Sequence, residues 1–412
     1  MRAGYSFYRR LTALNEFKFD FSLERVKKAL ILAGDPQDSF DCVHIAGSNG
    51  KGSTAWYLSN ILMAHGFKTG TYTSPHLLDV KERVAINGGN VKEKLFLSEG
   101  SILFKLLSQN NLKLTYFEFL TVLAFMIFRT EHVRVAVVEA GLGGRFDATN
   151  VYYKRKLLSA ITSISLEHTD YLGKTRMLIL KEKEEIATAG MLVANVEAAG
   201  LKKHLKGRFG KRVIFADEVY PAKGVDHGTG RLAIKYPNTT LETRMIEPVQ
   251  ARNLSTVLSC LKVMGYVGYR FDPKKVKKAV LDTVVPGRFS WNKKGYFLSV
   301  AHNPGAVKEV LKTLALFYPC KETVFVFSLL KDKDAETIFR EASRFKNISF
   351  VLTSIDNPRA INIAKMKEYV VKYGIRYKVE QDNKAALKLA KKMAGKGIVV
   401  VGGSFYLVSK FV

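Results

Sequence analysis

Paired cysteines are the first thing that this chain lacks. Its 412 residues include three cysteines, Cys42, Cys260 and Cys320, which lie far apart and in no paired spacing. Such a set predicts neither a disulfide framework nor a cysteine-based zinc cluster. We therefore expect the protein to work in a reducing compartment, the cytoplasm.

Long apolar runs are also missing. The longest, residues 119–128, lies between Glu118 and Arg129 and is much shorter than the roughly 20 residues that a membrane-spanning helix needs. The first 11 residues carry arginines but no apolar core behind them, which argues against a secretory signal. We expect a buried helix at 119–128 and no membrane partner.

Acidic residues are scarce relative to basic ones. The chain has 37 Asp and Glu against 65 Lys and Arg, a net charge of +28. The basic excess runs along the whole chain rather than gathering in one stretch, and no nucleic-acid-binding module is recognisable, so we do not expect a nucleic-acid partner. A general positive field instead attracts small anions such as nucleotides and polycarboxylates.

The order of apolar segments predicts an α/β fold with two doubly wound domains, because strand-like runs alternate with helical stretches. A small antiparallel sheet is expected between residues 213 and 244, where short β-rich pieces are broken by Gly and Pro. Val285-Pro286-Gly287 marks the junction, which gives domains 1–285 and 286–412. The expected strands are 42–46, 69–72, 133–139, 158–164 and 191–195, then 297–300, 323–327, 348–352 and 398–401.

A glycine-rich segment joins the first strand to a helix and reads HIAGSNGKGST from His44 to Thr54. Its glycines let the backbone wrap an anion, the helix N-terminus points N–H groups at phosphate, and Lys51 adds a positive charge. Ser53 is placed to touch a magnesium ion. The alternative is a glycine-rich turn without a ligand. The expected nucleotide-binding residues are Gly47, Asn49, Gly50, Lys51, Gly52 and Ser53.

Further motifs follow in order along the chain. They read YTSPHL at 72–77, TYFEF at 115–119, VEAGLGGRFDATN at 138–150, EHTD at 167–170, PGRF at 286–289, AHNP at 301–304, LKDKD at 330–334 and GGSF at 402–405. Together they resemble the folylpolyglutamate synthase and dihydrofolate synthase family, a branch of the Mur ligase superfamily. The resemblance runs from about residue 43 to 408. It implies a P-loop ATPase-like N-terminal domain and a smaller, Rossmann-like C-terminal ligase domain that binds glutamate.

The resemblance also implies a reaction. ATP phosphorylates a carboxylate, and an amine then displaces phosphate from the acyl phosphate, so neutralising charge with Mg²⁺ and a cationic loop is the central need. The substrates would be ATP, L-glutamate, and dihydropteroate or tetrahydrofolate. Residues 115–119 and 74–77 resemble the pterin-side segments of enzymes that perform both reactions, so we expect a bifunctional, monomeric ligase.

One candidate metal ligand follows from the sequence pattern alone, and the others follow from the resemblance. Glu139 ends a strand next to a glycine run, where open α/β sheets place ligands, and hard oxygen atoms suit magnesium. The resemblance implies that Ser74 joins Glu139 on one ion and that His168 and Lys183 serve a second. In the family the lysine is carbamylated, which converts a cation into a carboxylate. Here Glu184-Glu185 follows it, where the family usually has Ala-Gly.

For the second domain the resemblance implies that Asn253 and Arg288 approach ATP from across the cleft, with Arg288 reaching phosphate. His302 and Ser404 would lie near the incoming glutamate. Closing the domains would keep water from the acyl phosphate. The family commonly carries Asp three residues before this histidine, and here Ser299 stands in that place.

Three alternatives stay open. The first is an enzyme without the dihydrofolate synthase half, which acts as a folylpolyglutamate synthase only. A cell-wall Mur-type peptide ligase is the second, although such enzymes usually carry a further domain ahead of the phosphate loop, and about 42 residues precede it here. A nucleotide-dependent binding protein, whose basic surface serves nucleic acid, is the third.

Overall fold

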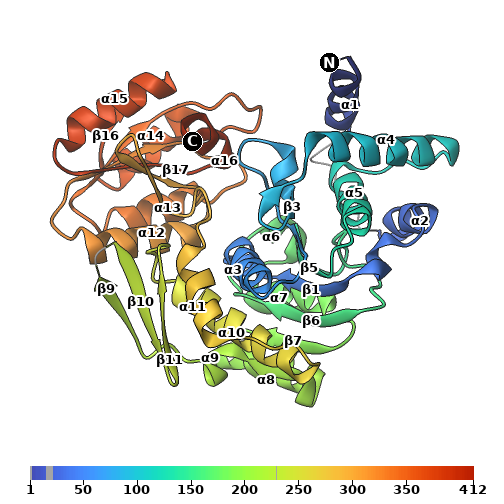
Figure 1. Cartoon of the computed structure of the whole chain (residues 1–412). Coiled ribbons are helices and arrows are strands. Elements are labelled where there is room, and N and C mark those ends of the chain that lie inside the picture. The colour runs from blue at the N-terminus through green and yellow to red at the C-terminus, as the bar shows by residue number, and fades with distance from the viewer. Residues whose placement is uncertain (1, 15–21, 229) are drawn as a thin grey trace. The chain divides into compact units, whose positions relative to one another are not determined.

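The structure is a computed structural model that describes residues 2–14, 22–228 and 230–412 (Figure 1). The chain forms two compact units, each with its own sheet. The N-terminal unit comprises Met1–Lys223, Lys235–Leu241 and Ala251–Leu281, and the C-terminal unit comprises Gly224–Ile234, Glu242–Gln250 and Asp282–Val412. The predicted α/β fold class is confirmed, whereas the predicted boundary at residue 285 stays a prediction.

The N-terminal unit is built on an eight-stranded sheet in the order β4-β3-β2-β5-β1-β6-β7-β8. The five pairs from β2 to β8 are parallel, and β3 and β4 add an antiparallel edge. The strands are β1 (Asp41–Ala46), β2 (Thr69–Tyr72), β3 (Val84–Ile86), β4 (Gly89–Asn90), β5 (Val135–Glu139), β6 (Lys156–Ile161), β7 (Met191–Ala194) and β8 (Val213–Phe215).

Helices flank this sheet (Figure 1). They are α1 (Arg2–Ala13), α2 (Glu24–Leu32), α3 (Lys51–Ala64), α4 (Glu93–Gln109), α5 (Tyr116–Thr130), α6 (Thr169–Leu172), α7 (Arg176–Lys183), α8 (Ala199–Phe209), α9 (Ala216–Val219), α10 (Gln250–Tyr266) and α11 (Pro273–Asp282). The buried helix expected at 119–128 is α5. It begins with a capping box, in which the side chain of Thr115 accepts from the Glu118 N–H and the Glu118 carboxylate accepts from the Thr115 N–H. No helix in the described part of the chain has the length and apolar character to span a membrane.

The small sheet differs from the prediction at its start. Val213–Phe215 does not belong to it but forms β8, which pairs in parallel with β7 at the edge of the large sheet. Val213 and Phe215 are buried in one core cluster with Leu205 and Phe209 of α8, and that burial fixes the strand. The small sheet itself is present, with three strands in the order β11-β10-β9: β9 (Gly224–Gly228), β10 (Arg231–Tyr236) and β11 (Thr239–Thr243).

The C-terminal unit has a six-stranded sheet in the order β12-β13-β17-β14-β15-β16, parallel except for β12. The strands are β12 (Ser290–Asn292), β13 (Tyr296–Ser299), β14 (Thr323–Phe327), β15 (Ile348–Leu352), β16 (Arg376–Val379) and β17 (Ile398–Gly402). The helices are α12 (Pro304–Phe317), α13 (Ala335–Ala342), α14 (Ile363–Lys372), α15 (Asn383–Ala394) and α16 (Phe405–Val408). Stacked and edge-on rings of Phe325, Phe327, Phe339 and Phe350 fill its core.

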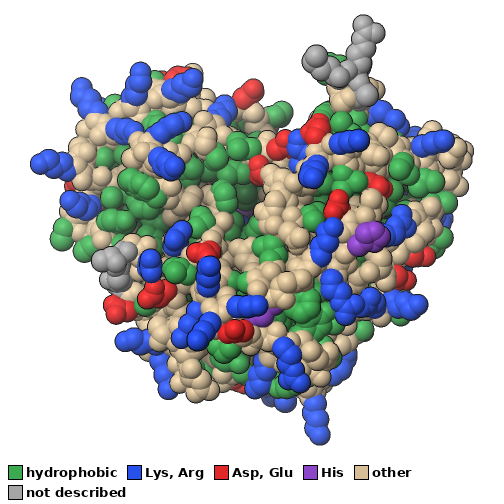
Figure 2. Space-filling model, viewed as in Figure 1, with side chains coloured by type: hydrophobic (Ala, Val, Ile, Leu, Met, Phe, Trp, Pro, Cys, Tyr) green, Lys and Arg blue, Asp and Glu red, His purple; other side chains and the backbone are tan. Residues whose placement is uncertain are grey.

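The basic excess is visible on the protein surface in Figure 2. On the face shown in Figure 2, Lys and Arg side chains are scattered among polar and apolar atoms rather than gathered in one patch. This distribution matches the even spread along the sequence and favours a diffuse attraction for small anions.

Candidate active site

Four neighbouring parallel strands of the N-terminal unit place motif residues at one edge of the sheet. In the order β2, β5, β1 and β6, their carboxyl ends lead to Ser74, Glu139, Gly47 and Thr162. Ligands of open α/β sheets bind at this edge, beyond the carboxyl ends of the strands. The motifs that the sequence analysis singled out separately therefore meet at one place in the fold.

The phosphate loop runs from β1 into α3, and two of its glycines are required by geometry. Gly47 has φ +146°, and a Cβ there would lie 2.0 Å from Oγ1 of Thr162. Gly50 has φ +88°, and its Cβ would lie 2.2 Å from Oδ1 of Asn253. Both positions combine a backbone that favours glycine with a close neighbour. Gly52 and Ser53 are buried in the first turn of α3, where backbone N–H groups are free to meet an anion.

Lys51 is the first residue of α3, and its ammonium lies over the loop. Nζ donates to the carbonyl oxygen of Gly47 at 2.8 Å and approaches that of Ser48 at 3.4 Å. These are weak partners compared with a phosphate, because they carry no formal charge. The lysine is thus held at the loop and able to exchange carbonyl contacts for phosphate contacts.

A segment that the sequence analysis did not assign to the site braces the loop. Oγ1 of Thr162 and Oγ of Ser163 both donate to the carbonyl oxygen of Asn49, at 2.7 and 2.9 Å. Ser165 accepts from Nδ2 of Asn49, and its own N–H donates to Oγ of Ser48. The run of Ser and Thr after β6 was the available signal in the sequence for this role.

Asn253 lies elsewhere than the resemblance implied. It is buried on α10, belongs to the same compact unit as the phosphate loop, and lies directly beside Gly50. The expected approach from the second domain is therefore wrong for this residue. The small size of Gly50 and the entry of α10 into the N-terminal unit explain the placement.

Glu139 and Ser74 are brought together. The Ser74 N–H donates to Oε2 of Glu139 at 3.2 Å, and the Glu139 side chain is 3% exposed. This backbone contact puts two residues with hard oxygen atoms, a carboxylate and a hydroxyl, next to each other, and magnesium prefers such atoms. Within the described ranges no group of three or more His, Cys, Asp and Glu residues gathers as a metal site. A metal at this edge thus depends on oxygen atoms from other residue types, such as Ser74.

Lys183 ends α7 and is buried, with 2% of its side chain exposed. Its Nζ lies 2.8 Å from Oε1 of Glu167 and donates to the Gly47 carbonyl oxygen at 3.1 Å, so it shares that acceptor with Lys51. Burial lowers the pKa of Lys183, although Glu167 opposes the shift. Burial alone would raise the pKa of Glu167, but the two ammonium groups, Lys183 before Lys51, bring it down to about 2.

His168 follows Glu167 directly and is the residue before α6, with φ +45°. The acids after Lys183 turn away from it. Glu184 is fully buried, and its carboxylate contacts Nε2 of His204 at 2.9 Å and Nη1 of Arg208 at 2.5 Å. The departure from the family's Ala-Gly is therefore accommodated by His204 and Arg208 of α8, and Glu184 is kept away from Lys183.

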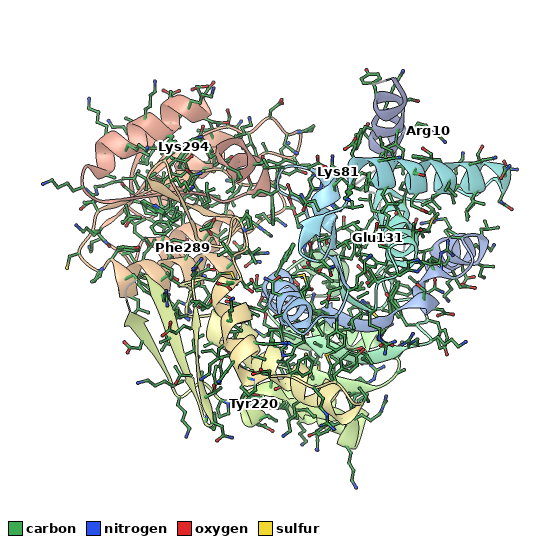
Figure 3. All side chains as sticks on the ribbon, viewed as in Figure 1. Arg10, Lys81, Glu131, Tyr220, Phe289 and Lys294 are labelled. Carbon is green, nitrogen blue, oxygen red and sulfur yellow. The ribbon has the colours of Figure 1, made fainter. Side chains whose placement is uncertain are left out.

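In the C-terminal unit, Arg288 lies on a turn whose Gly287 has φ +74°. The Val300 N–H donates to the Gly287 carbonyl oxygen at 2.8 Å, which ties the turn to the end of β13. The next residue is Phe289, which is labelled in Figure 3. Its ring stacks on that of Phe297, with the centroids 4.3 Å apart. Burial raises the pKa of the nearby Glu247 to about 7, although the Arg288 guanidinium opposes the shift.

His302 and Ser404 lie at the carboxyl edge of the second sheet. Nδ1 of His302 lies 2.9 Å from the Val300 carbonyl oxygen, which can only accept, so this nitrogen carries a proton. Ser404 caps α16 by accepting from the Leu407 N–H at 3.1 Å. The ring of Phe405 lies 5.9 Å from that of His302, so both predicted residues occupy one region.

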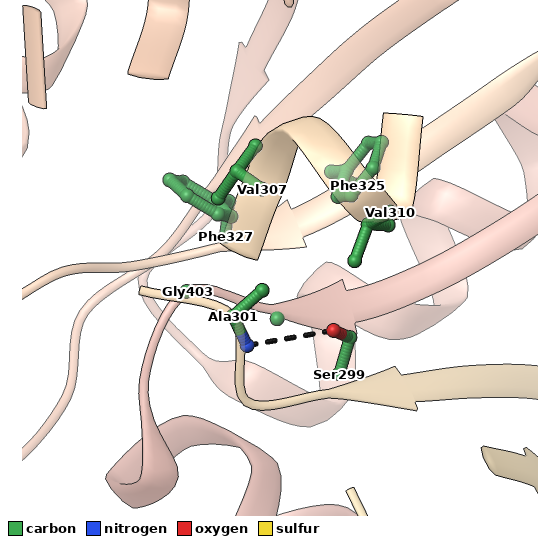
Figure 4. A pocket seen from close by; sticks show the side chains of 8 residues that line it. Ser299, Ala301, Val307, Val310, Phe325, Phe327 and Gly403 are labelled. Carbon is green, nitrogen blue, oxygen red and sulfur yellow. Dashed lines mark hydrogen bonds between the residues drawn. The ribbon is translucent and has the colours of Figure 1, made fainter. Parts of the chain in front are cut away.

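Ser299, which stands in place of the family's Asp, borders a small apolar pocket (Figure 4). Its Oγ accepts from the Ala301 N–H at 3.4 Å, next to His302. A carboxylate here would face aromatic and aliphatic walls, which explains why a neutral side chain fits. The pocket is lined by Ser299, Ala301, Val307, Val310, Phe325, Phe327, Gly402 and Gly403.

Comparisons with known proteins agree with this architecture. The family model described as Mur ligase, glutamate ligase domain matches residues 287–405. The chain is 31% identical over 384 residues to the dihydrofolate synthase/folylpolyglutamate synthase of Buchnera aphidicola subsp. Schizaphis graminum, and the match covers 89% of this chain and 86% of that protein.

Solved structures match across both units. A Mycobacterium tuberculosis folylpolyglutamate synthase complexed with ADP has a TM-score of 0.89 at 27% identity, covering 99% of this chain and 97% of that one. A bifunctional folylpolyglutamate synthase/dihydrofolate synthase from Yersinia pestis, complexed with AMPPNP and a Mn ion, has a TM-score of 0.83 at 27% identity, covering 99% and 96%. The resemblance inferred from the motifs is confirmed: this chain belongs to the dihydrofolate synthase/folylpolyglutamate synthase family of Mur ligases, which are ATP-dependent ligases that form carbon–nitrogen bonds.

Proposed function

We propose that this enzyme uses ATP to activate a carboxylate of dihydropteroate, and of reduced folates, and joins it to the amino group of L-glutamate. The observation that carries the proposal is the single sheet edge at which an anion-binding loop meets the Glu139–Ser74 pair. An oxygen of the substrate carboxylate attacks the γ-phosphorus and ADP leaves. The glutamate nitrogen then attacks the acyl carbon, loses a proton, and phosphate leaves.

The phosphate loop provides the electrostatic half of the chemistry. Backbone N–H groups in the first turn of α3 and the ammonium of Lys51 hold the phosphates of ATP, with Asn253 beside Gly50 on the same unit. Little covalent work falls to side chains, because phosphoryl transfer is catalysed mainly by positioning and charge. The braced loop suits this role, since its donors are fixed before the reaction.

Two divalent cations are proposed next to the loop. Oγ of Ser74 and the carboxylate of Glu139 hold one, and His168 with a carbamylated Lys183 holds the other. Bound Mg²⁺ would neutralise charge on the transferred phosphoryl group. The burial of Lys183 supports the modification: a neutral amine in a dry site attacks CO₂ at carbon, forms an N–C bond and loses a proton to give a carbamate.

The C-terminal unit is proposed to supply the glutamate side. Arg288, held on a turn fastened to β13, has the planar fork that binds two phosphate oxygens. His302 and Ser404, which lie in one region at the carboxyl edge of the second sheet, would bind the incoming glutamate.

A substrate assay tests the proposal. Purified enzyme is given Mg·ATP and L-glutamate with dihydropteroate in one arm and tetrahydrofolate in the other, and phosphate release is followed together with product mass. Turnover in both arms supports bifunctionality, and turnover with tetrahydrofolate alone would reduce the function to folylpolyglutamate synthesis. Turnover only with a nucleotide-sugar peptide, or salt-sensitive nucleic-acid binding without an amide product, would overturn it.

We also propose that the enzyme is a monomer that works in the cytoplasm. Three free cysteines, of which Cys42 and Cys260 are buried, suit a reducing compartment. Sedimentation equilibrium should give the mass of one chain, 46.2 kDa, and twice that mass would contradict the monomer.

A further inference from the structure

A row of buried polar side chains lies beneath the phosphate loop, and the proposed function uses none of them. His44 is on β1, Asp147 and Thr149 follow β5, and Lys156 opens β6. Thr149 and His44 have no exposed surface, and Asp147 is 5% exposed. Buried polar groups are costly unless they are hydrogen-bonded, so this row must satisfy itself.

The distances fix the direction of its hydrogen bonds. Oδ1 of Asp147 accepts from the Thr149 N–H at 3.0 Å and Oδ2 accepts from the Leu142 N–H at 2.8 Å, so both carboxyl oxygens are acceptors. The Thr149 hydroxyl, 2.5 Å from Oδ1, is therefore a donor to Asp147. Its oxygen in turn accepts from Nε2 of His44 at 2.7 Å.

The other end of the row is fixed by the same logic. Burial, and then the charge of Lys156, hold the pKa of His44 well below its usual value, so the ring carries one proton, on Nε2. Nδ1 then accepts from Nζ of Lys156 at 3.4 Å. The hydrogen bonds therefore run in one direction, from the Lys156 ammonium through His44 and Thr149 to the Asp147 carboxylate. Each donor in this chain meets an acceptor.

This chain touches the two segments that carry Glu139 and Lys183. Asp147 holds the N–H of Leu142 in the turn after Glu139. That turn packs on α7, because a Cβ at Gly144 would lie 2.8 Å from Cα of Lys183. Lys156 also donates to the carbonyl oxygen of Ile186, three residues after Lys183.

We propose that His44, Thr149 and Asp147 are positioning residues that hold the turn at 141–144, and with it Glu139 and Lys183, in the geometry that binds the divalent cation. This inference rests on the proposed function. Groups behind metal ligands orient those ligands, and their loss typically costs about 10- to 100-fold in metal affinity.

Thr149→Val tests it, since valine keeps the shape but removes both hydrogen bonds of the hydroxyl. Free Mn²⁺ is measured by electron paramagnetic resonance while Mn²⁺ is titrated into enzyme with a non-hydrolysable ATP analogue. We expect the Mn²⁺ dissociation constant to rise about tenfold and kcat to fall, with the KM for glutamate little changed. Thr149→Ser should restore both values.

The matched control is Thr313→Val in the C-terminal unit. Thr313 is also fully buried, and its hydroxyl donates to the Glu309 carbonyl oxygen at 2.7 Å. This variant should lower Tm without changing Mn²⁺ affinity. Lys156→Met is the second test variant. Lys156 is only partly buried, so its replacement disturbs the fold less than a change at Thr149. If Thr149→Val does not fold, the Mn²⁺ affinity of Lys156→Met decides the question.

The outcomes separate the positioning role from the proposed function. If the wild-type enzyme does not bind Mn²⁺ with the nucleotide analogue, the proposed function fails. If the wild type binds and the folded test variants bind Mn²⁺ with unchanged affinity, the positioning role is wrong and the buried chain serves only the stability of the fold.

Discussion

Nζ of Lys183 lies 2.8 Å from Oε1 of Glu167, and both side chains are largely withdrawn from water. As an ammonium, Lys183 is neutralised by this carboxylate. As a carbamate, it would be a second anion beside Glu167, and two buried anions at such a distance repel strongly. The modification and the binding of a cation must therefore support each other.

Carbamylation of Lys183 should depend on a divalent cation. With ¹³C-labelled bicarbonate, we expect a carbamate carbon signal by NMR that strengthens when Mg²⁺ is added and is absent from Lys183→Arg, because the cation offsets the repulsion by Glu167. A signal of equal strength after the ion is removed by chelation would contradict this coupling.

Lys183→Ala should reduce kcat at least 100-fold, since it removes a proposed metal ligand, and added formate should restore part of the activity by supplying a small carboxylate. Lys181→Ala, an exposed lysine on the same helix, is the control and should keep wild-type activity. Wild-type turnover by Lys183→Ala would end the assignment of this lysine.

Gly50→Ala should weaken ATP binding more than it weakens the fold. Its Cβ would lie 2.2 Å from Oδ1 of Asn253, so the loop or the Asn253 side chain must shift, and both are proposed to contact the nucleotide. Gly66→Ala is the control for backbone strain without a close neighbour. Gly66 has a similar φ of +82°, but its Cβ position has nothing within 4 Å. Titration calorimetry with ATP should show a loss of about tenfold or more for Gly50→Ala only, whereas both variants lose about 1 kcal/mol of stability. Equal ATP affinities would show that the close approach is unimportant.

Glu247 should make stability fall as pH rises. Burial raises its pKa from 4.5 to about 7, so between these values the unfolded chain releases a proton that the folded chain keeps. The associated loss is roughly 3 kcal/mol, complete above pH 7. Glu247→Gln has no ionisable group at this position and so lacks this pH-dependent loss of stability. Urea unfolding should therefore show the variant gaining stability relative to the wild type between pH 5 and 8. The exposed Glu242→Gln should show no such gain, and an unchanged difference for Glu247→Gln would contradict the buried carboxyl.

Several central strands were predictable because they are buried on both faces. The strands at 69–72, 323–327 and 348–352 have the predicted bounds. In the last two, the apolar run is continuous and sharply bounded, as is usual in parallel sheets. The edge strand β16 was missed because it is mostly exposed, and its sequence RYKV has no apolar run. Edge strands are set by pairing with a neighbour, which a local pattern does not show.

The site, like the fold, was predictable only in part. Glycines and Lys51 of the loop were found because their spacing is local. The partner of Lys183, the hydroxyls that brace Asn49, and the contact between His44 and Thr149 join residues far apart in sequence, such as 105 positions for the last pair. No local spacing encodes such contacts. Asn253 was assigned to the wrong unit because the chain returns to the N-terminal unit at α10, after residues 242–250 of the C-terminal unit. A local motif does not show the path of the chain between units.

Transfer of the γ-phosphoryl group of ATP to the substrate carboxylate can be followed with an isotope. Dihydropteroate labelled with ¹⁸O in its carboxylate is incubated with enzyme, Mg·ATP and L-glutamate, and the released phosphate is analysed by mass spectrometry. We expect one ¹⁸O atom in each phosphate, because the oxygen that attacks the γ-phosphorus leaves with it. Amide product accompanied by phosphate without the label would contradict activation through an acyl phosphate.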